Sequence, residues 1–249
     1  MKERIVESRK GVMRYGMEVQ VKQEVLVEEN NFQVIEGTGR RKYYIGKQKM
    51  AYRVVKRIMD VVCSVIALIV LFPVFLITAV AIWIEDGGPV IYAQDRNGLN
   101  GKVFRMYKFR SMCRDAEKLH KKLLKRNEAD GPVFKMKRDP RVTKVGRVIR
   151  RTSIDELPQL INILKGDMSI VGPRPIVTYE TERFNEYQKQ RMAVKPGLTC
   201  YWQCRGRSDV SFDEWIELDL KYIEEESFWV DVKIVLHTVR IVLSGKGAY

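Results

Sequence analysis

The longest feature of the chain is an apolar run from Val61 to Ile84. It holds 24 residues without a charged side chain, and 16 of them are Val, Ile, Leu or Phe. Such residues favour entry into a bilayer by roughly 0.3 to 0.6 kcal/mol each, whereas a helix in a soluble core rarely runs this far without a polar face. The run therefore predicts a helix inside a membrane.

Pro73 divides this run near its middle. An unbroken helix of this length would reach about 36 Å, which is enough to cross a bilayer. However, proline removes a helix hydrogen bond and bends the axis. Basic residues also flank the run on both sides, and a crossing would put one flank outside the cytoplasm, against the usual bias. The pattern favours a re-entrant helix that bends at Pro73, and a single kinked span stays as the alternative.

The rest of the chain divides around this helix. Residues 1–52 are polar and mixed in charge, and we predict an extension with a strand at 19–27 and a loop at 36–42. Residues 53–86 hold the membrane helix and its basic start. Residues 87–249 follow as a small cytoplasmic domain.

Shorter patterns give the expected fold class of that domain. Val90–Ala93 and Val103–Phe109 predict strands on either side of a turn at Asn97-Gly98. Apolar residues spaced three or four apart predict a helix over 111–126, whose basic face either stays in water or lies on anionic lipid. We therefore expect an α/β fold, mixed but mainly α and membrane-associated, with amphipathic surface helices.

The charge of the chain is concentrated in one segment. The formal net charge is +14, and residues 96–151 alone contain 19 Lys and Arg against 5 Asp and Glu. A segment this basic indicates an anionic partner such as phosphate, nucleic acid or acidic lipid. A solvated basic face is the simpler alternative.

Cysteine and histidine are too sparse to carry the chemistry. The cysteines form no zinc-finger spacing, and free thiols in a reducing compartment are the expected state. Carboxylates and arginines are then the residues left for a reaction. The residues concerned are Cys63, Cys113, Cys200, Cys204, His120 and His237.

Two adjacent carboxylates, Asp155 and Glu156, stand at a predicted helix start and are called the dyad below. Capping alone is the simpler explanation, because Ser153 and Glu156 fit an S/T-x-x-E capping box and Pro158 suits a first turn, or makes Asp155 the cap. Nearby arginines favour a site as well, since they keep a carboxylate ionised and bind phosphate oxygens in pairs. These arginines are Arg141, Arg147, Arg150, Arg151 and Arg174.

Several long motifs follow one another between Arg53 and Tyr249. With them the chain resembles the bacterial sugar transferases, the monotopic phosphoglycosyl transferases that begin glycan assembly on a polyprenyl phosphate. Cys200–Cys204 departs from the family's usual Gly-Leu/Trp-Trp/Ala-Gln-Val pattern, which bears on the local pocket and on sugar choice. The matching motifs are Lys56–Asp60, Tyr107–Met112, Asp139–Thr143, Arg151–Gln159, Gly166–Pro175, Lys195–Thr199 and Gly247–Tyr249.

The resemblance implies a covalent transfer in which Asp155 attacks the β-phosphate of a UDP-sugar. UMP leaves, and undecaprenyl phosphate then takes the phosphosugar from Asp155. It also implies Mg²⁺ bound through Asp155 and Glu156, and a helix bent near Pro73 that enters one leaflet only. For phosphate binding we expect Lys108, Arg110, Arg141, Arg174 and, more weakly, Arg207.

The implied setting is the cytoplasmic face of a bacterial cell membrane, at the first membrane step of exopolysaccharide, capsule or O-antigen synthesis. Partners would be a UDP-hexose such as UDP-galactose or UDP-glucose, undecaprenyl phosphate and membrane lipids, without nucleic acid; a homodimer is left open. A membrane-anchored binder of nucleic acid or acidic lipid is the competing function, but it leaves the dyad and the Pro173-Arg174-Pro175 turn unexplained.

Overall fold

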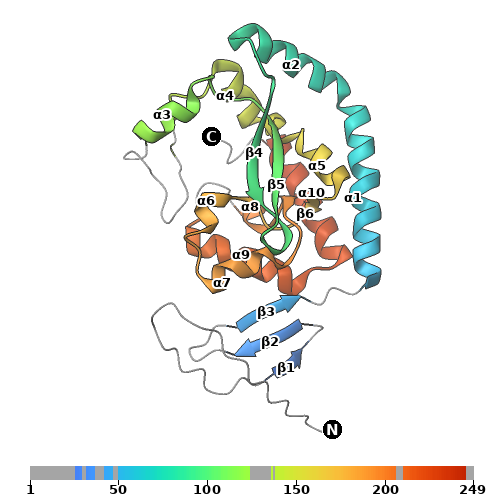
Figure 1. Cartoon of the computed structure of the whole chain (residues 1–249). Coiled ribbons are helices and arrows are strands. Elements are labelled where there is room, and N and C mark those ends of the chain that lie inside the picture. The colour runs from blue at the N-terminus through green and yellow to red at the C-terminus, as the bar shows by residue number, and fades with distance from the viewer. Residues whose placement is uncertain are drawn as a thin grey trace.

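The computed structural model describes residues 26–29, 32–36, 42–46, 50–123, 136, 138–205 and 210–244. In this part the chain is mixed α/β and mainly helical, as predicted (Figure 1). Most of the predicted strand at 19–27 and of the loop at 36–42 lies outside the described residues. Those near them form an antiparallel meander of β1 (Leu26–Glu29), β2 (Phe32–Glu36) and β3 (Lys42–Gly46).

The apolar run forms two helices with a sharp bend between them. α1 (Met50–Val70) and α2 (Phe72–Asp86) meet at Leu71, and their axes are bent by 62°. Pro73 lies in the first turn of α2, where its missing N–H removes no helix hydrogen bond. The predicted break beside Pro73 is confirmed. Among the described helices none alone is long and apolar enough to cross a membrane, whereas this bent pair is by length and composition.

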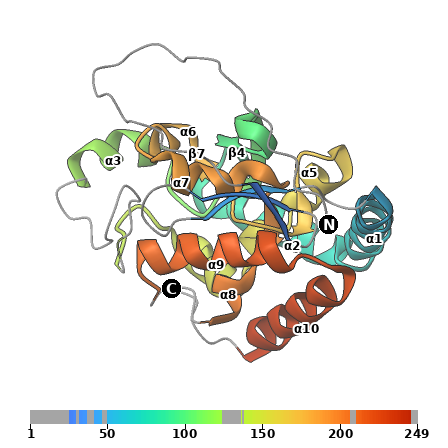
Figure 2. The same cartoon turned by 90° about the horizontal axis from the view of Figure 1, so that it is seen from below.

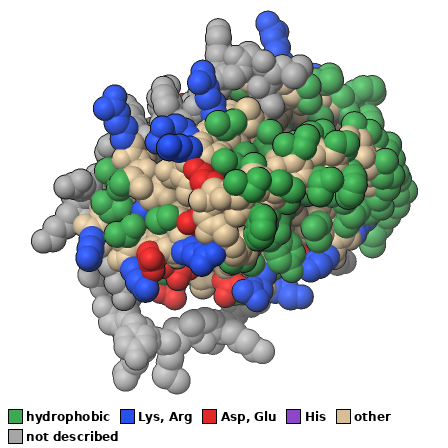
Figure 3. Space-filling view, turned by 90° about the horizontal axis from the view of Figure 1, so that it is seen from above, with side chains coloured by type: hydrophobic (Ala, Val, Ile, Leu, Met, Phe, Trp, Pro, Cys, Tyr) green, Lys and Arg blue, Asp and Glu red, His purple; other side chains and the backbone are tan. Residues whose placement is uncertain are grey.

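The outer sides of α1 and α2 are apolar and exposed. Figure 3 shows these side chains as a broad hydrophobic surface along one flank of the molecule. Such a surface on a soluble protein would be a large liability, which supports contact with lipid. The residues that contribute to it include Ile58, Val62, Ile66, Ile69, Val70, Phe72, Leu76, Ile77, Trp83 and Ile84.

A hairpin follows the two helices. β4 (Ile91–Asn97) pairs antiparallel with β5 (Val103–Phe109), and β7 (Ile176–Val177) joins the other edge of β4. The turn includes a short 3-10 helix, Leu99–Gly101, with positive φ at Asn100 and Gly101. Both predicted strands are confirmed, and β4 extends farther than Ala93.

The helix predicted over 111–126 begins later than expected. α3 spans Ala116–Leu123, because Met112 instead forms an isolated β-bridge with Val142. Residues 124–126 lie outside the described part. The bridge uses backbone groups that a first helical turn at this position would need for its own hydrogen bonds. The helix start predicted from the apolar spacing was therefore wrong.

The remaining elements surround a short parallel pair, β6 (Ser169–Val171) and β8 (Gly197–Thr199). The main buried cluster joins this pair to the last two helices and includes Val171, Ile216, Leu220 and Ile234. The helices are α4 (Lys144–Arg151), α5 (Gln159–Lys165), α6 (Thr178–Thr181), α7 (Glu186–Lys189), α8 (Tyr201–Arg205), α9 (Phe212–Glu225) and α10 (Phe228–Ser244), with 3-10 turns η3 (Ile154–Glu156) and η4 (Gln190–Ala193).

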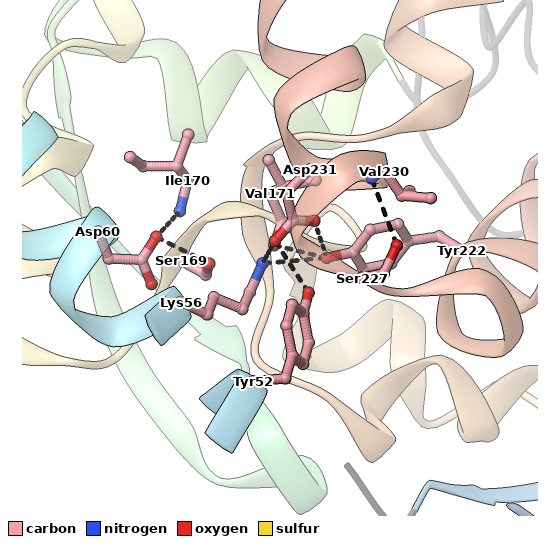
Figure 4. Close-up of polar contacts among 10 residues, drawn as sticks. All are labelled: Tyr52, Lys56, Asp60, Ser169, Ile170, Val171, Tyr222, Ser227, Val230 and Asp231. Carbon is pink, nitrogen blue, oxygen red and sulfur yellow. Dashed lines mark hydrogen bonds and ion pairs between the residues drawn. The ribbon is translucent and has the colours of Figure 1, made fainter. Parts of the chain in front are cut away.

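Buried polar contacts fix α1 to this domain (Figure 4). Lys56 Nζ lies 2.5 Å from Asp231 Oδ2 of α10, and the hydroxyls of Tyr52 and Tyr222 also donate to Asp231. We call these four residues the polar clamp. One turn later, Asp60 accepts hydrogen bonds from Ser169 and from the backbone N–H of Ile170 in β6. The first half of the bent pair is thereby attached to the strand that leads to Arg174.

Candidate active site

The dyad lies on η3, between α4 and α5. Ser153, just before it, adopts a left-handed conformation with φ 58°, and its side chain caps nothing. The predicted capping box is therefore absent. α5 begins at Gln159 after Pro158, so Asp155 does not cap it either. The acidic pair is held at a strained turn without the capping role that would explain it locally.

Glu156 is the charged anchor of the site. Its Oε1 accepts hydrogen bonds from Lys108 Nζ and from an Arg174 guanidinium nitrogen, both at 3.0 Å. Burial would raise the pKa of this carboxyl, but Lys108 and Arg174 outweigh it and hold the pKa well below the ordinary value. Burial also lowers the pKa of Lys108, which Glu156 opposes. Glu156 thus keeps two cations in place.

Asp155 has the opposite surroundings. Asp155 is only 9% exposed, and its carboxylate forms no hydrogen bond or ion pair with the described residues. Burial raises its pKa to about 6, and adjacent Glu156 adds to the rise, while Lys108, Arg150 and Arg174 oppose it. Near neutral pH Asp155 is therefore ionised, unpaired and poorly solvated. Those are the properties of a carboxylate nucleophile.

The segment before Arg174 is fixed by a close backbone contact. Gly172 and Gly197 approach so closely that a Cβ on Gly197 would lie 2.0 Å from the Gly172 nitrogen. Hydrogen bonds from Gly197 N to Pro173 O and from Arg191 to the Arg174 carbonyl hold the turn. The guanidinium also lies 5.8 Å from the centre of the Trp202 ring. Arg174 is thus oriented by its neighbours as well as by Glu156.

Lys108 is oriented by the packing of β5 on α5. The Asn162 side chain accepts from the backbone N–H of Tyr107 and donates to the carbonyl of Arg105, at 2.9 and 2.7 Å. Asn162 is fully buried, so both bonds are sheltered from water. This link sets the position of the strand one residue away from Lys108.

The other predicted phosphate-binding residues have different surroundings. Arg110 is paired with Asp86 at 3.0 Å and donates to the Gly87 carbonyl at the end of α2. Arg141 forms a two-pronged pair with Asp139. Arg207 lies outside the described residues. The structure thus brings Lys108 and Arg174 together at the dyad, whereas phosphate binding by Arg110, Arg141 and Arg207 stays a prediction.

Sequence reasoning missed Arg96. This residue lies on β4, donates to the Pro175 carbonyl at 3.1 Å and acts electrostatically on both Lys108 and Arg174. In the sequence it is one arginine of a predicted hairpin, between Asp95 and Asn97. Arg96 lies beside the Pro-Arg-Pro turn only because β4 pairs with β7. No pattern in the sequence around Arg96 predicts that pairing.

The comparisons with known proteins now bear on this site. Residues 51–245 match the model of the family described as bacterial sugar transferase. The chain belongs to this family. It is 46% identical over 223 residues to a galactosyl transferase, CpsE, of Streptococcus agalactiae, covering 88% of this chain and 49% of that protein. The match therefore includes the dyad and every described residue of the site.

Two further bacterial sugar transferases extend the comparison. An undecaprenyl-phosphate galactose phosphotransferase of Salmonella typhimurium is 44% identical over 212 residues, covering 81% of this chain and 43% of that protein. The exopolysaccharide production protein ExoY of Sinorhizobium fredii is 40% identical over 198 residues, covering 78% and 88%. This chain thus spans about half the length of the first two relatives and most of the third.

The oxygens of the dyad decide whether it suits Mg²⁺. Both ion pairs of Glu156 use Oε1, so its Oε2 and the Asp155 carboxylate are the oxygens that can meet an ion. No group of three or more metal-binding side chains occurs among the described residues. Mg²⁺ in phosphotransfer sites commonly uses one or two carboxylates plus substrate phosphates. The dyad therefore fits an ion that binds together with a diphosphate.

Proposed function

We propose that this chain transfers a hexose 1-phosphate from a UDP-sugar to undecaprenyl phosphate. One observation carries the proposal: an unpaired, buried carboxylate of raised pKa, Asp155, lies beside a carboxylate that holds two cations. The printed names of relatives agree, because they include an undecaprenyl-phosphate galactose phosphotransferase and an N-acetylgalactosamine counterpart.

In the first step, an Asp155 oxygen attacks the β-phosphorus of the UDP-sugar. The bond from this phosphorus to the bridging oxygen breaks, and its electron pair leaves with UMP. Lys108 and Arg174 lie where they neutralise charge on the phosphoryl oxygens, which is the main need of phosphoryl transfer. Asp155 then carries the sugar 1-phosphate.

In the second step, a phosphate oxygen of undecaprenyl phosphate attacks the same phosphorus. The Asp155 carboxylate leaves, and the product is undecaprenyl diphosphate linked to the sugar. Division into two steps spares the site from holding two polyanions in line at once. Mg²⁺, when bound through Asp155 and Glu156, would neutralise the diphosphate of the donor.

A membrane location agrees with this acceptor. The exposed apolar sides of α1 and α2 support insertion into one leaflet of the cell membrane, with the domain after residue 86 on the cytoplasmic face. We propose that the bent pair is re-entrant and that residues 1–52 are an extension. The product would start an exopolysaccharide, a capsule or an O-antigen. A homodimer could carry out this reaction as well as a monomer.

The test is UMP release by the purified chain in detergent, with undecaprenyl phosphate, Mg²⁺ and a panel of UDP-sugars. We expect turnover with at least one UDP-hexose, with UDP-galactose first because two of the relatives above are named for galactose. Turnover should require undecaprenyl phosphate. Tight binding of anionic lipid without UMP release from any donor would contradict the proposed reaction. It would favour the competing function, a membrane-anchored binder of acidic lipid.

A further inference from the structure

Arg96 is a partly buried cation whose hydrogen bonds go to neutral oxygens. One guanidinium nitrogen donates to the Pro175 carbonyl at 3.1 Å and the other to the Gln94 side chain at 2.7 Å. Its Nε–H is buried and has no hydrogen-bond partner among the described residues. An arginine with a buried donor commonly pairs with a carboxylate or a phosphate, because an unpaired charge held away from water is unfavourable. This guanidinium has a donor to spare and no anion bonded to it.

The strand register aims Arg96 at the site. On β4 and β5, Tyr92 lies opposite Lys108 and Arg96 lies opposite Phe104. Directly opposed residues share a face of an antiparallel pair, and so do residues two apart on one strand. Arg96 and Lys108 therefore leave the hairpin on the same face. The contact with Pro175 then sets Arg96 next to Arg174.

From this geometry we infer that Arg96 and Arg174 form a second phosphate-binding subsite beside the dyad, one that takes a phosphoryl group the covalent step does not hold. The inference rests on the proposed function, since it assigns the subsite to one of the substrates of that reaction. The ligand chemistry is a phosphate mono- or diester anion. Its source is either the donor diphosphate or the headgroup of the acceptor lipid.

Charge explains why this subsite requires an anion. Arg174 shares Glu156 with Lys108, so one carboxylate oxygen serves two cations before Arg96 is counted. Glu180 acts on Arg96 electrostatically but accepts no hydrogen bond from it. Arg96 and Arg174 repel each other electrostatically. An anion bound to both would relieve this repulsion, and a phosphate can bind both forks.

Two tyrosines lie around this subsite. Tyr92 and Tyr179 both act electrostatically on Arg96, and their side chains are 37% and 47% exposed. Tyr92 comes from β4, and Tyr179 comes from α6 just after the Pro-Arg-Pro turn. Their hydroxyls are hydrogen-bonded to carboxylates, Tyr92 to Glu117 and Tyr179 to Glu180. Because both tyrosines are partly exposed, a ligand can reach Arg96 from the solvent on their side.

The direct test is thermal protection of the detergent-solubilised full chain by inorganic pyrophosphate, which needs no turnover. Arg96→Gln keeps a donor toward Pro175 and removes the charge, whereas Arg105→Gln removes an exposed arginine from the opposite face of the same hairpin. We expect pyrophosphate to raise the melting temperature of wild type and Arg105→Gln, and the concentration required to rise about tenfold or more in Arg96→Gln. Equal protection of Arg96→Gln would overturn the subsite.

Two kinetic arms identify the source of the phosphate. One measures UMP release from UDP-galactose without lipid, and the other measures discharge of the loaded enzyme by undecaprenyl phosphate. If the half-saturating concentration of UDP-galactose in the first arm is about tenfold higher for Arg96→Gln than for wild type, Arg96 binds the donor. If the half-saturating concentration of undecaprenyl phosphate in the second arm rises in this way, Arg96 binds the acceptor. If Arg96→Gln does not fold, Arg96→Lys replaces it, with a smaller loss of protection expected; unchanged protection there overturns the subsite too. Absence of UMP release by wild type would contradict the proposed function. Thermal protection by pyrophosphate would then still test whether Arg96 binds phosphate.

Discussion

Asp155 and Glu156 are neighbours in the chain, yet their surroundings move their ionisation in opposite directions. The Glu156 pKa is held low by Lys108 and Arg174 against its burial, whereas burial raises the Asp155 pKa to about 6. Two carboxylates whose pKa values are driven apart have separate tasks in many enzymes. Here Glu156 holds cations, and Asp155 is the more basic and more nucleophilic oxygen.

The raised pKa of Asp155 predicts that this residue costs stability. Its folded value of about 6 lies above the ordinary value of 3.8, so ionisation destabilises the fold as pH rises through 6, and the cost is absent below pH 3.8. At pH 7.5, Asp155→Asn should raise the free energy of unfolding by about 1 to 3 kcal/mol. Urea unfolding at pH 7.5 and 4.5 measures this, with the gain shrinking at the lower pH.

Exposed Asp95→Asn is the control for this measurement and should change stability little at either pH. A variant Asp155→Asn that is less stable than wild type at pH 7.5 would mean that the carboxylate holds the fold together. That outcome would remove the main argument for a free nucleophile.

Arg174 makes a separate prediction at the residue scale. It is fixed by Glu156, by Trp202 and by a glycine-dependent turn, so its fork is set in one direction. Arg174→Lys keeps the charge but loses the paired geometry, and we expect activity to fall at least about tenfold while the melting temperature moves by a few degrees at most. Exposed Arg183→Lys should leave both unchanged. A collapse of the melting temperature would make Arg174 a structural ion-pair residue.

At the scale of elements, α1 belongs to two environments. Its outer side is apolar, and its inner side carries Lys56 and Asp60, which reach the clamp and β6. A helix that contacted lipid on all sides would not be expected to carry charged side chains on one of them, because charges inside a bilayer are unfavourable. The inner side therefore makes α1 part of the catalytic domain, and lipid contact on its outer side would hold the site close to the membrane surface.

The polar clamp gives a prediction for this element. Lys56→Met would leave Asp231 buried with two tyrosine hydroxyls and no cation, which costs about 3 to 5 kcal/mol. We expect a fall in the melting temperature of several degrees or more, measured in detergent. Lys233→Met, on the exposed side of α10, should have little effect. A Lys56→Met chain as stable as wild type would show that the clamp contributes no net stability.

The sequence allowed good prediction of elements and poor prediction of their contacts. The apolar run and Pro73 were enough to predict a bent pair of apolar helices, because the length of an apolar run and the presence of a proline act locally. Ser153 led to a wrong expectation. The sequence around it matches a capping box, but its backbone is left-handed. Arg96 was missed for a related reason. Its role depends on a two-residue strand, β7, in which Val177, 81 positions downstream, pairs with Arg96.

At the scale of the whole molecule, the proposed re-entrant bend would leave both flanks of the helix pair in one compartment. We predict that Ile45→Cys and Asp95→Cys, each in a chain whose four native cysteines are replaced, both resist a membrane-impermeant thiol reagent in intact cells. Pro73→Leu should straighten the pair and expose one site to the reagent, because it supplies the N–H that would let the hydrogen bonding of α1 continue into α2. Val74→Leu is the control. Ready labelling of either cysteine without Pro73→Leu would mean that the helix pair spans.

The covalent role of Asp155 is central to the proposed reaction, and one measurement tests it most directly. The chain is mixed with UDP-galactose and Mg²⁺ without lipid, and its intact mass and released UMP are followed. The account predicts one UMP per chain and the added mass of one hexose phosphate on the peptide that contains Asp155, both absent in Asp155→Asn. UMP release that occurs only with undecaprenyl phosphate, without any adduct on the protein, would contradict it.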